Sequence, residues 1–131
     1  MTVLVGYVPS PEGEAALRAG IDEARLRDEK LLVVNTSRGD ALLDTRFAQE
    51  PDLAHVREDL AALGVEFEIR QVLGGRDAAE EIIDLAELPD VSLVVIGLRR
   101  RSAVGKLIMG SAAQQILMGV DCPILAVKTA S

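Results

Sequence analysis

Aromatic residues are nearly missing from this sequence of 131 residues, which contains no tryptophan, one tyrosine and two phenylalanines. Hydrophobic residues still make up 49% of the chain, so a core has to be built from valine, leucine, isoleucine and alanine. Side chains of this kind suit the interior of an α/β protein, in which β-branched residues fill buried strands. The length fits a single compact domain, which we expect to span residues 1–131.

Positive charge, cysteine and long apolar runs are also scarce. With 14 basic and 21 acidic residues, the formal net charge is −7, and this field repels nucleic acids and anionic membranes. We therefore expect no nucleic acid and no membrane as a partner, and any anion site must be local. No apolar run approaches a membrane span, and no signal-peptide pattern opens the chain. Since Cys122 is the single cysteine, an intrachain disulfide is excluded, and we expect a cytoplasmic protein.

Residues suited to catalysis or metal binding are few. His55 is the single histidine and falls on the polar side of a helix predicted from Pro51, which favours a surface position. A P-loop is not completed, because Leu107 stands where a serine or threonine would bind the metal. No nucleophile, base and orienting group cluster in the sequence. We therefore expect binding rather than turnover.

The sequence does contain a regular alternation of strand and helix patterns. Strands are predicted at residues 3–8, 31–35, 65–70, 93–96 and 124–127, and helices at 11–28, 51–63, 78–88 and 112–119, with a loop at 36–50. The third strand alternates apolar and charged residues, which is typical of a sheet edge. The last strand is apolar on both faces, so a partner subunit could cover it. Five strands alternating with four helices predict a doubly wound parallel sheet, whose strand order the pattern leaves open.

The most distinctive stretch is residues 91–111, VSLVVIGLRRRSAVGKLIMGS. Its apolar run predicts a strand buried on both faces, which Gly97 is predicted to end. A helix is predicted to follow Gly110 and Ser111. The intervening loop contains four cations: Arg99, Arg100, Arg101 and Lys106. In a parallel sheet such a loop lies at the carboxyl end of its strand, where α/β proteins bind ligands and a helix start offers N–H groups to an anion.

Each feature of this stretch also has a purely structural interpretation. Ser111 and Gln114 can form a capping box that satisfies the N–H groups of their own helix. Gly97 and Gly110 can each end a strand or permit a turn, and the arginine run can be a solvated loop paired with acids. A capped helix still presents N–H groups and a positive dipole end, so capping and phosphate binding are compatible.

This stretch resembles the phosphate-binding signature of the universal stress protein family: a glycine, two residues, a second glycine, nine residues, and then Gly-Ser or Gly-Thr. Gly97 takes the first position and the pair Gly110-Ser111 the last, with the nine-residue spacing intact. Arg100 stands at the position of the second glycine. Residues 121–127, DCPILAV, are similar to the family's closing strand, and the resemblance spans the whole chain.

The resemblance implies a five-stranded, Rossmann-like sheet of the adenine nucleotide alpha hydrolase-like type, with strand order 3-2-1-4-5. It also implies a homodimer that meets through the fifth strands, here Ile124 to Val127, and a site for ATP or AMP, with magnesium left open. Val8 stands where ATP-binding relatives commonly have an aspartate, and Val34 matches the position whose backbone contacts adenine in them. The site residues implied in this way are Val8, Val34, Gly97, Arg99, Arg100, Gly110, Ser111, Ala112 and Ala113.

The function that the resemblance implies is that of a small stress-response protein that responds to a bound adenine nucleotide by a conformational or oligomeric change. One alternative is a family member without nucleotide binding that acts as a dimeric interaction module, for which Val8 and Arg100 are the evidence. Another is a slow ATP hydrolase, which the lack of a carboxylate in the loop opposes.

Overall fold

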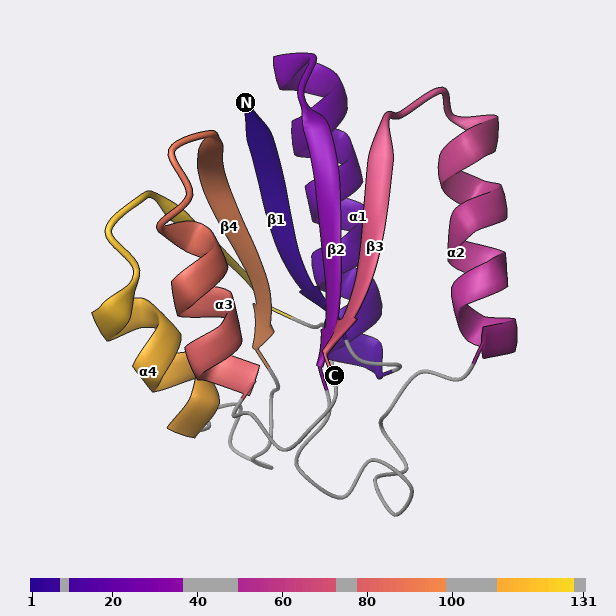
Figure 1. Ribbon diagram of the computed structural model, residues 1–131. Helices are drawn as coiled ribbons and strands as arrows, with labels where there is room; N and C mark the ends of the chain where they lie inside the picture. The colour runs from indigo at the N-terminus through magenta and orange to yellow at the C-terminus, as the bar shows by residue number, and fades with distance from the viewer. Residues whose placement is uncertain (8–9, 37–49, 73–77, 99–110, 129–131) are drawn as a thin grey trace.

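The computed structural model describes residues 1–7, 10–36, 50–72, 78–98 and 111–128 as alternating strands and helices (Figure 1). The strands are β1 (Thr2–Tyr7), β2 (Lys30–Thr36), β3 (Phe67–Val72), β4 (Val91–Leu98) and β5 (Ile124–Lys128). The helices are α1 (Pro11–Arg27), α2 (Glu50–Ala62), α3 (Ala78–Ala86) and α4 (Ser111–Gly119). All neighbouring strands are parallel, in the order β3-β2-β1-β4-β5. The predicted fold class and the implied strand order are confirmed.

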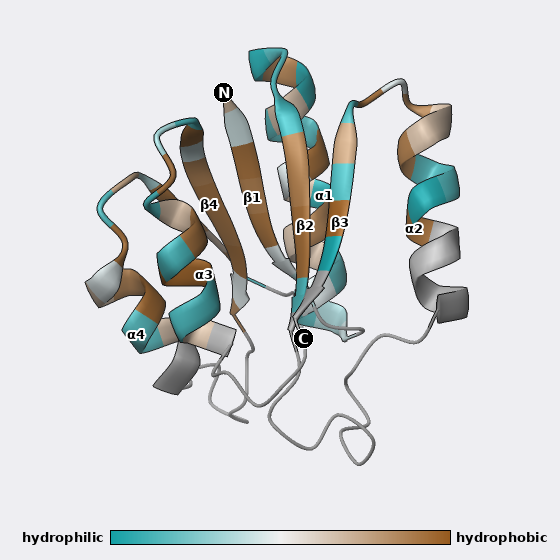
Figure 2. Ribbon diagram, viewed as in Figure 1, coloured by the Kyte–Doolittle hydropathy of each residue, from teal (hydrophilic) through white to brown (hydrophobic). Residues whose placement is uncertain are grey.

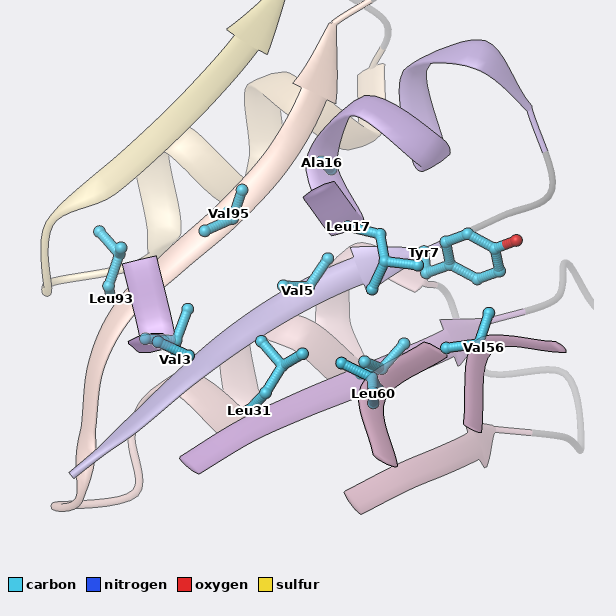
Figure 3. Close-up of a cluster of buried hydrophobic side chains, with 12 residues drawn as sticks. Val3, Val5, Tyr7, Ala16, Leu17, Leu31, Val56, Leu60, Leu93 and Val95 are labelled. Atoms are coloured by element: carbon cyan, nitrogen blue, oxygen red, sulfur yellow. The ribbon is translucent and has the colours of Figure 1, made fainter. Parts of the chain in front are cut away.

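Helices cover both faces of the sheet, because alternate residues of the central strands point to opposite sides. Val3 and Val5 of β1 pack with Leu17 of α1 and Leu60 of α2 in one buried cluster (Figure 3). Leu4, between them, joins a second cluster with residues of α3 and α4. Figure 2 shows the central strands as hydrophobic along most of their length. The core is therefore aliphatic, as the shortage of aromatic residues predicts.

Local chemistry sets the start of α1. Ser10 is the N-cap, and its side-chain hydroxyl accepts a hydrogen bond of 3.1 Å from the backbone N–H of Gly13. Pro11 occupies the first helical turn, where a backbone N–H would have no partner within the helix, so the lack of an N–H in proline costs no hydrogen bond. After α2, Gly64 adopts a left-handed φ of 73°, a conformation typical of the glycine that follows a helix.

Strand β3 is an edge strand with one wetted face, as predicted. Phe67 and Ile69 pack toward α1 and α2. On the other face, Glu68 accepts a hydrogen bond of 2.9 Å from Arg70 and lies 3.5 Å from the ammonium group of Lys30. The hydrogen bond from Arg70 lowers the pKa of the Glu68 carboxyl, and the charge of Lys30 acts in the same direction. Opposite charges therefore line this edge of the sheet.

Several predicted boundaries were wrong: the third strand, predicted at 65–70, is Phe67–Val72, and the third helix, predicted at 78–88, ends at Ala86. The predicted loop at 36–50 is too long, because Thr36 still belongs to β2 and Glu50 already belongs to α2, while residues 37–49 lie outside the described ranges. Gly97 does not end the fourth strand either, because β4 continues to Leu98 and pairs Gly97 with Val127 of β5. Hydrogen bonding to a neighbouring strand, which the local sequence does not reveal, extends β4 past the glycine. Among the described helices, none combines the length and apolarity needed to cross a bilayer.

Candidate functional site at the carboxyl edge of the sheet

The carboxyl ends of the parallel strands and the amino ends of the helices gather along one edge of the sheet, the lower edge in Figure 1. The chain order reverses between β1 and β4: β2 and β3 extend the sheet on one side of this pair, and β5 extends it on the other. In doubly wound sheets, ligands bind at such a switch point. Helix α1 follows β1, and α4 is the next helix after β4, so both connections leave the sheet at this point.

Glycine at position 97 is required by the close approach of α1. A Cβ atom there would overlap the backbone carbonyl of Glu12, in the first turn of that helix. The signature glycine therefore brings the end of β4 against the start of α1, directly before the predicted phosphate loop. This contact gives Gly97 a packing role that is independent of any ligand.

A hydrogen bond ties the same turn of α1 to β1. The ring of Tyr7 is buried between α1 and α2, and its hydroxyl donates a 2.8 Å hydrogen bond to the Glu14 carboxylate (Figure 3). Beside Tyr7, in register on β2, Asn35 is fully buried. Tyr7, Glu14 and Asn35 are not among the site residues predicted from the sequence. The position of a polar residue at the end of an apolar strand could have pointed to Asn35. The hydrogen bond between Tyr7 and Glu14 joins two different elements, and no sequence pattern indicates it.

The remaining predicted site residues are placed as follows. Val34 of β2 is fully buried and pairs with Gly6 of β1 and Arg70 of β3. Strand β2 continues for two more residues, to Thr36, toward the carboxyl edge of the sheet. Ser111 and Ala112 open α4, and Ala113 of its first turn packs partly against the α3 and α4 cluster. The predictions for four residues lie outside the described ranges: Val8, Arg99, Arg100 and Gly110. The convergence of the arginines on α4, and the contact of Val34 with adenine, stay predictions.

The helix starts at this edge differ in charge. The first turn of α1 contains Glu12 and Glu14, and that of α3 contains Glu80 and Glu81. The first turn of α4 contains no acid. Acidic side chains offset the positive end of a helix dipole, so the start of α4 retains more attraction for an anion than the starts of α1 and α3.

Chemistry beyond anion binding has little support among the described residues. No group of three or more histidine, cysteine, aspartate and glutamate side chains in those ranges could hold a metal ion. Cys122 is half-buried just before β5, and burial raises the pKa of its thiol. The thiol is therefore protonated, and a weak nucleophile, near neutral pH.

Together, the sheet order and its carboxyl edge define a doubly wound α/β protein with an acid-free helix start beside the switch point. The model of the Universal stress protein family matches residues 1–128, and the chain belongs to this family. A universal stress protein of Mycolicibacterium smegmatis is 48% identical over 126 residues, which cover 96% of each chain.

Two solved structures are similar over nearly the whole chain. A universal stress protein from Archaeoglobus fulgidus is 30% identical, with a TM-score of 0.71, and the match covers 98% of both chains. A structure of the universal stress protein from Archaeoglobus fulgidus in complex with dAMP is 25% identical, with a TM-score of 0.65 over 98% of both chains.

Proposed function

We propose that this protein binds an adenine nucleotide at the carboxyl edge of its sheet, with the phosphates at the start of α4. The observation that carries the proposal is the first turn of α4, which contains no acidic residue. Helix α4 is the next helix along the chain after β4, and β4 is one of the two strands that flank the switch point. Free N–H groups and an uncompensated dipole make such a helix start attractive to phosphate. The cations of the preceding loop, Arg99, Arg100, Arg101 and Lys106, would add charge and bidentate hydrogen bonds.

A relative supports the choice of an adenine nucleotide. The Archaeoglobus fulgidus protein whose structure contains dAMP shares the fold and a quarter of its aligned residues with this chain. We infer that nucleotide occupancy is converted into a conformational or oligomeric response, in keeping with a stress protein. The scarcity of catalytic groups makes binding, rather than hydrolysis, the proposed activity.

We also propose a homodimer formed through β5. The two edges of the sheet differ in a way that supports this choice. Strand β3 exposes Glu68 and Arg70, and charged residues discourage pairing of sheet edges. Residues 124–127 of β5 are uncharged and remain half-exposed, although helices α1 and α4 cover the two faces of this strand.

Calorimetric titration with AMP and ATP, with and without magnesium, tests the nucleotide site. The wild-type protein should bind at least one of them, and Gly110→Asp should abolish binding because it adds bulk and negative charge beside the phosphates. Leu26→Asp is the control, since it places the same charge at the opposite edge, on a side chain of the last turn of α1 that is 82% exposed. Circular dichroism should show both variants folded.

The alternatives have distinct outcomes. If no nucleotide produces heat with the wild-type protein, the dimeric interaction module without a ligand is favoured. Equal binding by wild type and Gly110→Asp would place the phosphates elsewhere. Release of phosphate from ATP faster than a heat-inactivated control would instead support a slow hydrolase.

A further inference from the structure

The first turn of α1 is in contact with both strands that flank the switch point. Helix α1 follows β1 in the chain and packs against β1 and β4. Its first turn meets the end of β4 at Gly97, where a Cβ atom would lie 2.6 Å from the carbonyl carbon of Glu12. Since backbone meets backbone at this point, a shift of the turn has to be accompanied by a shift of Gly97.

Tyr7, at the end of β1, holds the same turn from the other strand. Its hydroxyl donates a hydrogen bond of 2.8 Å to the Glu14 carboxylate, and its ring is buried with Leu17 of α1 and Val56 of α2 (Figure 3). The backbone of Glu14 is fixed as well, because its N–H donates a hydrogen bond of 2.9 Å to the carbonyl of Ser10. The buried ring cannot follow a moving carboxylate, so this hydrogen bond ties the first turn of α1 to β1.

The hydroxyl of Tyr7 supplies something that the apolar core does not require. Among the buried core residues of the described ranges, Tyr7 is the one aromatic side chain. Phenylalanine would fill the same space, so packing alone does not explain the hydroxyl. A hydrogen bond to a carboxylate is directional and stronger than one between neutral groups, whereas apolar burial has no direction. The bond therefore sets the position of the first turn of α1 more closely than aliphatic contacts do.

We propose that Tyr7 is a positioning residue for the phosphate site, and that it acts through α1 on the end of β4. Its hydrogen bond to Glu14 holds the first turn of α1, and this turn holds Gly97. Strand β4 ends one residue later, at Leu98, and the next helix is α4, whose start is the proposed position of the phosphates. The inference rests on the proposed nucleotide site and adds to it a residue that controls the site without touching the ligand.

Calorimetric titration with AMP and ATP tests this role. Tyr7→Phe should raise the dissociation constant about threefold to tenfold, the size of effect that residues outside a binding site have when they are coupled to it. Thr2→Val is the matched control, because it removes a hydrogen bond of 3.2 Å from a buried threonine to the carboxylate of Asp90, at the opposite edge of the sheet. Urea unfolding should show that both variants lose stability, while Thr2→Val leaves the dissociation constant unchanged. Equal weakening by both variants would overturn the proposal.

Two substitutions of Glu14 separate the hydrogen bond from the charge. Glu14→Gln and Glu14→Ala remove the same negative charge, but glutamine keeps a side-chain oxygen that can accept a hydrogen bond from the Tyr7 hydroxyl. Glu14→Gln should therefore bind nucleotide more tightly than Glu14→Ala, and Tyr7→Phe should cause no further loss when it is added to Glu14→Ala. Equal affinities of the two Glu14 variants, or additive losses in the double variant, would contradict the proposed role.

A measurement without nucleotide keeps this inference separate from the proposed function. In amide NMR spectra of the ligand-free protein, Tyr7→Phe should shift the resonances of Gly97 and Leu98, and Thr2→Val should not. If these resonances shift but the wild-type protein binds neither AMP nor ATP, the nucleotide site is wrong and the link from Tyr7 to the end of β4 is upheld. If they stay in place, the link is absent and the positioning role is overturned, even where nucleotide binds.

Discussion

At the scale of single residues, Gly97 has two possible reasons to be glycine. As the first glycine of a phosphate-binding signature, it would let a ligand approach the backbone. The structure supplies another reason, because the carbonyl of Glu12 occupies the space that a Cβ would need. The motif could be found from the sequence, but the packing reason could not, since Glu12 and Gly97 are far apart in the chain.

We expect Gly97→Ala to destabilise the fold by about 1–3 kcal/mol, the usual cost of adding volume to a well-packed site. The new methyl group would meet backbone, which cannot move without displacing the start of α1. Gly6→Ala should cost less, because its Cβ would lie 2.9 Å from the end of the flexible Ile82 side chain. Urea unfolding of both variants measures the difference, and an equal or smaller loss for Gly97→Ala would contradict the account.

At the scale of elements, the sequence predicts most of the helices and strands, because local chemistry determines them. Ser10 and Pro11 set the start of α1, and the alternation of apolar and charged residues identifies β3 as an edge strand. The errors occur where non-local pairing decides. Strand β4 extends to Leu98 because β5 offers hydrogen-bonding partners at its end.

The charged face of β3 gives a prediction for pH dependence. Arg70 and Lys30 lower the pKa of the Glu68 carboxyl, so their ion pairs with Glu68 stabilise the folded state. This stabilisation is complete above the ordinary glutamate pKa of about 4.3, and it is lost as the pH falls through the lowered pKa of Glu68 in the folded protein. Glu68→Gln should cost about 0.2–1 kcal/mol at neutral pH, as exposed ion pairs do, and nothing at pH 2.

Chemical unfolding at both pH values, and at neutral pH with added salt, measures this contribution. Glu66→Gln, at an exposed glutamate in the same segment, is the control for the change of net charge. A cost for Glu68→Gln that persists at pH 2, or that high salt leaves unchanged, would show that the ion pairs are not its source.

For the whole molecule, the location of the site can be predicted from the alternation of strands and helices. The residues that surround the site are harder to predict from the sequence. The signature places Gly97 and Ser111 at the carboxyl edge, and the structure confirms that β4 ends and α4 begins there. Residues from other elements were not foreseen, because the fold brings Tyr7, Asn35 and Glu12 to this edge from separate strands and helices.

Amide resonances followed by NMR during a titration with AMP or ATP show where the nucleotide binds. We expect the amides of Ser111, Ala112 and Ala113 to shift with increasing nucleotide, together with those near Gly97, while amides at the opposite edge, such as Asp90 and Gly64, keep their positions. Shifts confined to the opposite edge, or no shift at saturating nucleotide, would contradict the proposed site.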